Sequence, residues 1–274
     1  VNTYASTSDL FGQQGGLMQG YMMPRSNQKL DDYTQVSYGS GVIISQDGLI
    51  ITNNHVISSG SKVSVTLSDG TQYEAKILGQ DESSDLAVLK IEETNLKAVS
   101  IGSSKDLQVG QSVVAIGNPL SEEFSQTVTN GIISGVNRKL KADNQSFSLI
   151  QTNAAINSGN SGGALVDSNG KLIGINTAKI SAEGVEGIGF AIPIDEAMTI
   201  VQELVDKGSI EHAYIGFSGY LLTEELAKQA GVDYKGGVIV ASVVNNGPAD
   251  QAGIEVQFFC IRIHYKQGRH LCLS

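Results

Sequence analysis

Short apolar runs alternate with turn signals along most of the chain from residue 38 onward. The runs GVIIS and GLIIT flank a turn at Asp47-Gly48, and KVSVTLS and TQYEAKILG flank another at Asp69-Gly70. An Asp-Gly pair between two alternating apolar runs is a strong signal for a β-hairpin. Further runs are LAVLKI, SVVAIG, TVTNGIISGV, FSLIQT, GALVD, KLIGINTA and GIGFAIPI. Roughly ten or more short strands at this spacing predict an all-β fold, a barrel or a pair of barrels, rather than β-α-β units.

The period of the apolar residues changes near residue 194. In IDEAMTIVQELVDK they recur at helical spacing, with Asp195 and Glu196 in the first turn and Gly208 just past the last. Acidic residues favour the start of a helix and glycine favours its end. We therefore predict a helix over about 194–207 that closes a β domain of residues 38–208.

A second unit is predicted over residues 213–254. Its pattern indicates a short helix near 223–230, a strand over 237–244 and a helix that starts at Gly247-Pro248. The unit combines helices with strands, so we expect a small α+β domain.

The two ends of the chain are distinct from the units between them, and residues 5–36 show neither a strand nor a helix period. Residues 1–37 are interpreted as a strand remnant followed by a loop rich in Gly, Gln, Ser and Met, which includes Met18, Met22 and Met23. Flexible methionines suit an adaptable contact surface, and a disordered surface loop is the alternative. Residues 255–274 differ in character from the preceding unit and hold both cysteines. We interpret this tail as foreign to the domain, through a frameshift or a cloning artefact.

The composition excludes several classes of partner. The formal net charge is −10 and the longest basic cluster is Arg138-Lys139-Leu140-Lys141, which argues against nucleic acid and anionic membrane surfaces. Two cysteines provide neither a disulfide framework nor a metal-ligand spacing, so we predict no metal and no cofactor. The chain opens on Val1 rather than Met. We expect that a signal or membrane anchor preceded it.

A candidate nucleophile lies in the stretch INSGNSGGALVD. Ser161 is flanked there by Gly159, Gly162 and Gly163, whose unhindered φ values permit a tight turn with an exposed hydroxyl. Such a turn also aims backbone N–H groups at the oxyanion of an acyl-transfer intermediate. The turn Gly159-Asn160-Ser161 is the predicted oxyanion hole, with the N–H groups of Gly159 and Ser161 as donors. A glycine-rich hairpin turn is the alternative.

A serine nucleophile needs a general base and a group that orients the base. His55 is the candidate base because the other three histidines lie in the linker and the tail, whereas His55 follows a β run in LIITNNHVISS. Asp85 is the candidate carboxylate because it opens the apolar strand LAVLKI, which would fix its position. Asp81 and Glu82 have turn-like surroundings and are interpreted as solvated. Taken singly, a loop histidine and an acid at a strand start are the alternatives.

Taken together, the motifs TNNHVI, DLAVLKI, QTNAAINSGNSGGALVD and LIGINTA closely resemble the HtrA (Deg) family of trypsin-like serine proteases. The resemblance covers about residues 38–205. It implies that His55, Asp85 and Ser161 form a catalytic triad and that the domain consists of two perpendicular six-stranded antiparallel barrels.

The resemblance also implies a biological setting. It predicts an ATP-independent endopeptidase that degrades misfolded or damaged proteins, forms a homotrimer and acts on unfolded protein or peptide substrates. The expected location is extracytoplasmic, at a bacterial cell surface, either membrane-anchored or periplasmic. The Met-rich segment stands where the family carries a variable regulatory loop.

The resemblance extends to the second unit, which is similar to the beginning of a PDZ domain. Tyr214, Ile215 and Gly216 match the carboxylate-binding loop of that domain. The glycine-aspartate run expected after AGI is absent, so we predict a partial PDZ domain over 213–254. A further departure is Asn153, where the family commonly has Asp.

A trypsin-like fold also implies the walls of the pocket for the substrate's P1 side chain. The residues that would line it here are Ala155, Ile156, Asn176, Thr177 and Ala178. These walls are small or aliphatic and lack an acid, which favours Val, Ala, Ile or Leu at P1 over Lys or Arg. Lys179 lies at the predicted rim.

Two other classes of function stay open. The β domain could act as a scaffold in a chaperone or peptide-binding module, alone or together with proteolysis. The intact set of His55, Asp85 and Ser161 argues against a dead enzyme. A metalloenzyme is the third alternative, and the chain lacks HExxH or any paired ligand spacing.

Overall fold

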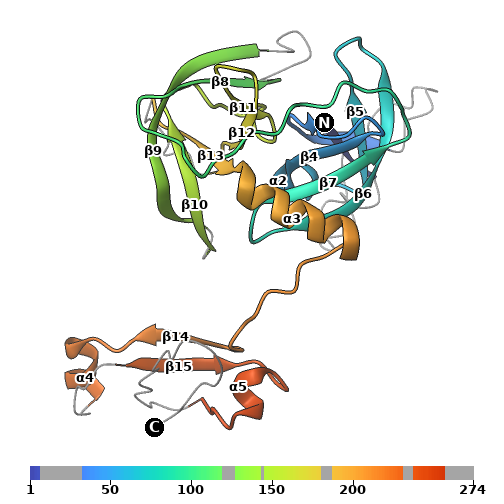
Figure 1. Ribbon diagram of the computed structural model, residues 1–274. Helices are drawn as coiled ribbons and strands as arrows, with labels where there is room; N and C mark the ends of the chain where they lie inside the picture. The colour runs from blue at the N-terminus through green and yellow to red at the C-terminus, as the bar shows by residue number, and fades with distance from the viewer. Residues whose placement is uncertain (7–32, 119–126, 143–144, 180–186, 231–236, 257–274) are drawn as a thin grey trace, which may run out of the picture. The chain divides into compact units, whose positions relative to one another are not determined.

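The computed structural model describes residues 1–6, 33–118, 127–142, 145–179, 187–230 and 237–256. The chain divides into two compact units, Val1–Ile210 and Glu211–Ser274, which are described separately here (Figure 1). Most of the predicted regulatory loop, with its three methionines, and most of the predicted tail, with both cysteines, lie outside the described residues.

The N-terminal half of the first unit is an antiparallel sheet of seven strands. In spatial order these are β2 (Tyr33–Tyr38), β1 (Asn2–Ser6), β5 (Lys62–Thr66), β6 (Gln72–Asp81), β7 (Leu86–Ile91), β4 (Leu49–Asn53) and β3 (Val42–Ile43). The two Asp-Gly turns join β3 to β4 and β5 to β6. Both predicted hairpins are therefore confirmed.

This sheet differs from the closed six-stranded barrel that the resemblance implied. Among the described strands, β2 and β3 are the two edges, so the hydrogen-bonded sheet is open. The physical reason lies in the short segment between these strands. Ser40 donates its backbone N–H to the carbonyl of Ser161 at 2.8 Å, so this group bonds to the other half of the unit rather than to a closing ladder.

The C-terminal half is a closed six-stranded barrel, as predicted. Its strands follow the order β10 (Gln145–Thr152), β13 (Gly189–Pro193), β12 (Leu172–Thr177), β11 (Ala164–Asp167), β8 (Ser112–Gly117) and β9 (Thr127–Ala142). All neighbouring strands in it are antiparallel. Figure 1 shows this barrel in green to yellow beside the blue N-terminal sheet.

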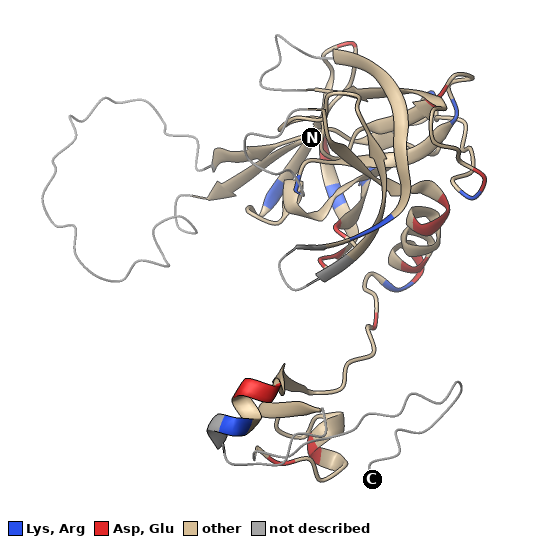
Figure 2. Ribbon diagram, turned by 90° about the vertical axis from the view of Figure 1, so that its left-hand side faces the viewer, with Lys and Arg blue, Asp and Glu red and all other residues tan. Residues whose placement is uncertain are grey.

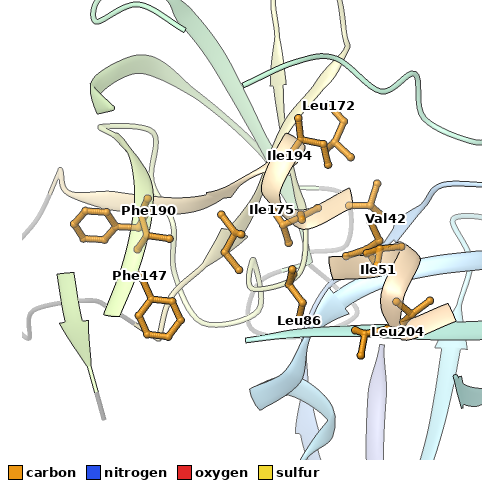
Figure 3. Packing of buried hydrophobic residues seen from close by; sticks show 14 of the residues in the cluster. Val42, Ile51, Leu86, Phe147, Leu172, Ile175, Phe190, Ile194 and Leu204 are labelled. Atoms are coloured by element: carbon orange, nitrogen blue, oxygen red, sulfur yellow. The ribbon is translucent and has the colours of Figure 1, made fainter. Parts of the chain in front are cut away.

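Helix α3 (Ile194–Lys207) covers both halves of the unit and ends at Gly208, with a left-handed φ of 78°. It buries Ile194, Ala197, Val201 and Leu204 against β6, β7, β12 and β13. Figure 3 shows the resulting core, which combines side chains of the N-terminal sheet (Val42, Ile51, Leu86), the barrel (Leu172, Ile175) and α3. Burying each such aliphatic side chain contributes about 1.5–3 kcal/mol. The helix therefore fixes the two halves against each other.

The helix presents its charged residues to solvent. Figure 2 shows acidic residues along α3, which include Asp195, Glu196, Glu203 and Asp206. Near its N-terminus, Asp195 accepts hydrogen bonds from the hydroxyls of Ser103 and Ser104 at 3.0 and 2.9 Å. Asp195 thereby ties the connection between the two halves to the helix.

The second unit contains β14 (Phe217–Leu221), α4 (Glu224–Ala230), β15 (Val238–Val243) and α5 (Pro248–Gln251). The elements α4, β15 and α5 agree with the sequence prediction within one or two residues, whereas strand β14 was not predicted. The two strands pair antiparallel over a small buried cluster of Val240, Ala249 and Ile254. On β14, Tyr220 and Leu221 are about two-thirds exposed, at 67% and 72%. The assignment to a partial PDZ domain stays a prediction.

No helix among the described residues is long and apolar enough to span a membrane.

Candidate active site

His55 and Asp85 form a two-point hydrogen-bonded pair. His55 lies on the short helix α2 (Asn54–Ile57), directly after β4, and Asp85 directly precedes β7. The ring Nδ1 lies 2.9 Å from Oδ1 and 2.8 Å from Oδ2 of Asp85, and the backbone N–H of His55 donates to Oδ1 at 3.0 Å. A carboxylate only accepts, so the ring proton is on Nδ1. In the neutral ring Nε2 then carries the lone pair and can act as a base.

Asp85 is held in an unusual backbone conformation. Its φ is 58°, in the left-handed region that Asp and Asn tolerate better than most residues. Its carbonyl accepts hydrogen bonds from the Asn53 side chain at 2.9 Å and the Asn54 N–H at 3.1 Å. The carboxyl also accepts the hydroxyl of Thr177 at 3.2 Å. A side chain that is 2% exposed thus has its polar atoms paired.

Two adjacent residues connect Ser161 to this pair by hydrogen bonds. Thr177 bonds to Asp85, and the next residue, Ala178, donates its backbone N–H to Ser161 Oγ at 3.0 Å. Among the described residues, no hydrogen bond joins the ring of His55 to Ser161. Catalytic hydrogen bonds are often long in a free enzyme and shorten in the substrate complex. Proton transfer from Ser161 to His55 stays a prediction.

The turn around Ser161 is built on glycines and contains the two predicted oxyanion donors. Gly159 and Gly162 have φ values of 96° and 82°, which favour glycine. Asn160 donates its N–H to the carbonyl of Asn157 at 3.0 Å. Within the part of the chain that the structure describes, the N–H groups of Gly159 and Ser161 have no hydrogen-bond acceptor. These are the two groups predicted to be oxyanion donors.

The residues predicted to line the P1 pocket occupy two kinds of position. Ala155 is exposed and Ile156 is 9% exposed, beside Gly189, where an added Cβ would lie 2.6 Å from the Ile156 side chain. Asn176 and Thr177 are instead buried, and the Thr177 hydroxyl bonds within the protein, whereas Oδ1 of Asn176 has no hydrogen-bond partner among the described residues. Nδ2 of Asn176 donates to the Ala164 carbonyl at 3.0 Å. A substrate contact by these residues stays a prediction, and Gly189 joins the candidates for the pocket.

Asn153 retains a bonding role in spite of its departure from the family pattern. Its Oδ1 accepts the backbone N–H of Ile132 at 2.7 Å. An amide oxygen can accept this bond as a carboxylate would, so the segment before Ala154 remains attached to β9.

The predicted carboxylate-binding residues, Tyr214, Ile215 and Gly216, belong to the second unit. Gly216 has a φ of 86° and its carbonyl accepts the N–H of Val244 at 2.8 Å. Tyr214 is 60% exposed. Among the described residues, no group of three or more His, Cys, Asp or Glu side chains is placed to hold a metal ion.

Sequence reasoning missed two supporting residues, Asn53 and Ser40, and one supporting contact, the bond from Thr177 to Asp85. Each acts through a contact with a segment distant in sequence. Only the Asn-Asn pair before His55 gave a local signal, because a polar turn directly after an apolar strand is a common place for functional side chains.

Comparison with known proteins shows extensive similarity. A family model described as a trypsin-like peptidase domain matches residues 39–175. Serine protease Do-like HtrA of Bacillus subtilis is 40% identical over 279 aligned positions, which cover 96% of this chain and 59% of that protein. Periplasmic serine endoprotease DegP of Escherichia coli is 45% identical over 224 positions, or 80% of this chain and 47% of that protein. The chain thus spans about half the length of the curated relatives it matches.

Solved structures give the same result. The HtrA-type protease AlgW with a decapeptide superimposes with a TM-score of 0.72 at 38% identity, over 93% of this chain and 78% of that chain. A serine endoprotease from Yersinia pestis gives a TM-score of 0.65 at 42% identity, over 84% of this chain and 73% of that chain.

Proposed function

Because the chain belongs to the trypsin-like peptidase family, and within it to the HtrA-type serine proteases, we propose that it is a serine endopeptidase that acts through an acyl-enzyme on Ser161. The observation that carries the proposal is the His55–Asp85 pair, with bonds of 2.8 and 2.9 Å, beside a serine in a glycine turn.

The first half of the reaction forms the acyl-enzyme. Nε2 of His55 takes the hydroxyl proton of Ser161 while Oγ bonds to the carbonyl carbon of the scissile peptide. The carbonyl oxygen becomes an oxyanion, which accepts the N–H groups of Gly159 and Ser161. The C–N bond then breaks, and the leaving amine receives the proton from His55.

The second half regenerates the enzyme. A water molecule gives a proton to His55 and its oxygen attacks the acyl carbon. The tetrahedral intermediate then collapses, the ester bond to Oγ breaks, and the proton returns from His55 to Ser161. Asp85 stays ionised throughout, fixes the Nδ1–H tautomer of His55 and stabilises the imidazolium.

The bond from Ala178 to Ser161 is compatible with this role. The N–H of Ala178 engages one lone pair of Oγ. The hydroxyl proton of Ser161 therefore remains free for donation to His55. The Ala178 N–H also stabilises the negative charge that develops on Oγ.

The wider biological role is proposed from the relatives. The name of the Escherichia coli relative describes a periplasmic endoprotease, and the AlgW structure contains a decapeptide. We infer that this chain cleaves misfolded or damaged proteins without ATP in an extracytoplasmic compartment, as a homotrimer, either soluble there or anchored to the membrane. Small aliphatic residues are the proposed P1 side chains.

The test is digestion of unfolded casein by the wild type and by Ser161→Ala, with products mapped by mass spectrometry. The wild type should release peptides in the absence of ATP and in the presence of EDTA, and the variant should release none. Equal digestion by both proteins would remove Ser161 from its role. Digestion that requires zinc would contradict the triad mechanism.

A further inference from the structure

We propose that Ser40 is a positioning residue for the oxyanion hole, an inference that rests on the proposed endopeptidase function. Ser40 lies between β2 and β3 in the N-terminal half, 121 positions before Ser161. It is 6% exposed, and its three polar groups all bond to other segments. Two of these bonds reach the turn that carries the nucleophile.

The hydroxyl of Ser40 connects two segments of the barrel. Its Oγ donates to the carbonyl of Gly159 at 2.6 Å and accepts the backbone N–H of Asn118 at 2.8 Å. The direction of both bonds is settled by chemistry, because a carbonyl only accepts and an amide N–H only donates. The hydroxyl proton therefore points at Gly159.

The backbone of Ser40 bonds to the same turn through its N–H and to β4 through its carbonyl. Its N–H donates to the carbonyl of Ser161 at 2.8 Å, and its own carbonyl accepts the hydroxyl of Thr52 at 2.7 Å. Glycines permit this approach. A Cβ added at Gly162 would collide with the carbonyl of Ser40, and a Cβ added at Gly163 would lie 3.2 Å from the Cβ of Ser40.

These contacts fix the peptide between the two predicted oxyanion donors. The N–H groups of Gly159 and Ser161 belong to the peptides that flank the Gly159–Asn160 peptide. Ser40 holds the carbonyl of Gly159, and Asn157 holds the N–H of Asn160. Because glycine has a wide choice of ψ, the Ser40 hydroxyl, together with the Asn157 carbonyl, restrains the peptide that lies between the two predicted donors.

Loss of this restraint should affect the transition state more than substrate binding. An oxyanion hole stabilises charge that exists only in the transition state, so its disturbance lowers kcat with little change in KM. Removing a donor outright costs roughly 10²–10³-fold in kcat. We expect Ser40→Ala, which leaves both donors in place but less ordered, to lower kcat about 10-fold or more.

The experiment compares Ser40→Ala with the wild type and with the matched variant Ser104→Ala. Ser104 also donates one hydrogen bond and accepts one, with Asp195, at the start of α3. The measurements are kcat and KM for a chromogenic peptide with Val at P1, the affinity of a peptide boronate that bonds to the nucleophile, and the melting temperature. Ser40→Cys is a milder variant in case the alanine variant does not fold.

The proposal predicts that Ser40→Ala loses kcat and boronate affinity in parallel while KM stays within twofold. Ser40→Cys should be intermediate, because a thiol is a weak donor and acceptor. Ser104→Ala should keep the wild-type kcat at a similar loss of melting temperature. A kcat within twofold of wild type for both Ser40 variants would overturn the positioning role and leave the proposed function intact. A wild type without activity or boronate binding would overturn both.

Discussion

Thr177 donates its hydroxyl to Oδ2 of Asp85 at 3.2 Å, and both residues are buried. The bond joins the end of β12 in the barrel to the start of β7 in the open sheet. The carboxylate therefore has one orientation, set by the two halves of the unit together, and it is the orientation that places Oδ1 and Oδ2 on the ring of His55.

Replacing Asp85 by Asn should abolish most activity without loss of the fold. Asn tolerates the φ of 58° as Asp does, but its amide favours the wrong tautomer of His55. We expect a loss on the order of 10⁴ in kcat, by analogy with the corresponding aspartate-to-asparagine change in trypsin.

The check is kcat on a peptide substrate together with a melting curve. Asp81, which the sequence indicated to be solvated, is instead buried, on β6, and accepts the Ser84 N–H at 2.8 Å. Asp81→Asn is therefore the matched control, because in the part of the chain that the structure describes Asp81 accepts no bond from His55. It should retain activity within a fewfold. A mild effect of Asp85→Asn would point to another carboxylate.

The carboxyl of Asp195 should make stability depend on pH. The hydrogen bond from the Ser104 N–H, with further bonds from the Ser104 and Ser103 hydroxyls and the charge of Lys105, lowers the pKa of Asp195 in the folded state. A lowered carboxyl pKa stabilises the fold above the unfolded value of about 3.9, and this contribution disappears as the pH falls through the folded value.

We therefore expect Asp195→Asn to lower the melting temperature at pH 7, and the difference from wild type to vanish near pH 2–3. Thermal unfolding across this range is the measurement. Asp206→Asn, on the same helix, serves as control because Asp206 bonds to the exposed Gln202 side chain. If the melting temperature of Asp195→Asn stays below that of the wild type at low pH, the shape of the side chain, rather than its charge, is responsible for the difference.

Ile156 should limit the size of the P1 side chain. It stands beside Gly189 before the nucleophile turn, so the wild type is expected to cleave after Val, Ala, Ile or Leu. Ile156→Ala should shift cleavage toward larger apolar residues by roughly 10-fold, since a methylene in such a pocket is worth about 1–3 kcal/mol. A peptide library resolves this. Dominant cleavage after Lys or Arg would refute the pocket assignment.

The first unit should cleave small peptides alone. Gly208 ends α3 by donating its N–H to the carbonyl of Leu204, and Ile210 packs against the core. A chain that ends after Ile210 therefore keeps the contacts that the residues of the first unit make with one another. We expect kcat for a short chromogenic peptide within about threefold of the full chain. Loss of this activity at an unchanged melting temperature would assign a catalytic role to residues 211–274.

Local patterns predicted the elements well. The Asp-Gly turns, the helix ending at Gly208 and the strand over 238–243 all have signals within a few residues of sequence. The motifs around His55, Asp85 and Ser161 likewise placed the candidates, and the structure brings His55 and Asp85 into contact.

Long-range contacts were not predictable in the same way. The open N-terminal sheet, the left-handed Asp85 and the bonds of Ser40 each depend on segments that are distant in sequence. Ser40 in YGSGVII gives no sign that its hydroxyl meets Gly159, because that contact exists only once the barrel has closed. Packing of one half against the other decides such features, and local propensity alone does not predict them.

The most direct test of the account is the intact mass of the protein after exposure to a fluorophosphonate, followed by peptide mapping. The reagent bonds to an activated serine oxygen with loss of fluoride. The account predicts a single adduct per chain, located on Ser161, and none on Ser161→Ala or His55→Ala. A wild type that hydrolyses peptides yet carries no adduct on Ser161, or an equal adduct on His55→Ala, would contradict the claim that His55 activates Ser161.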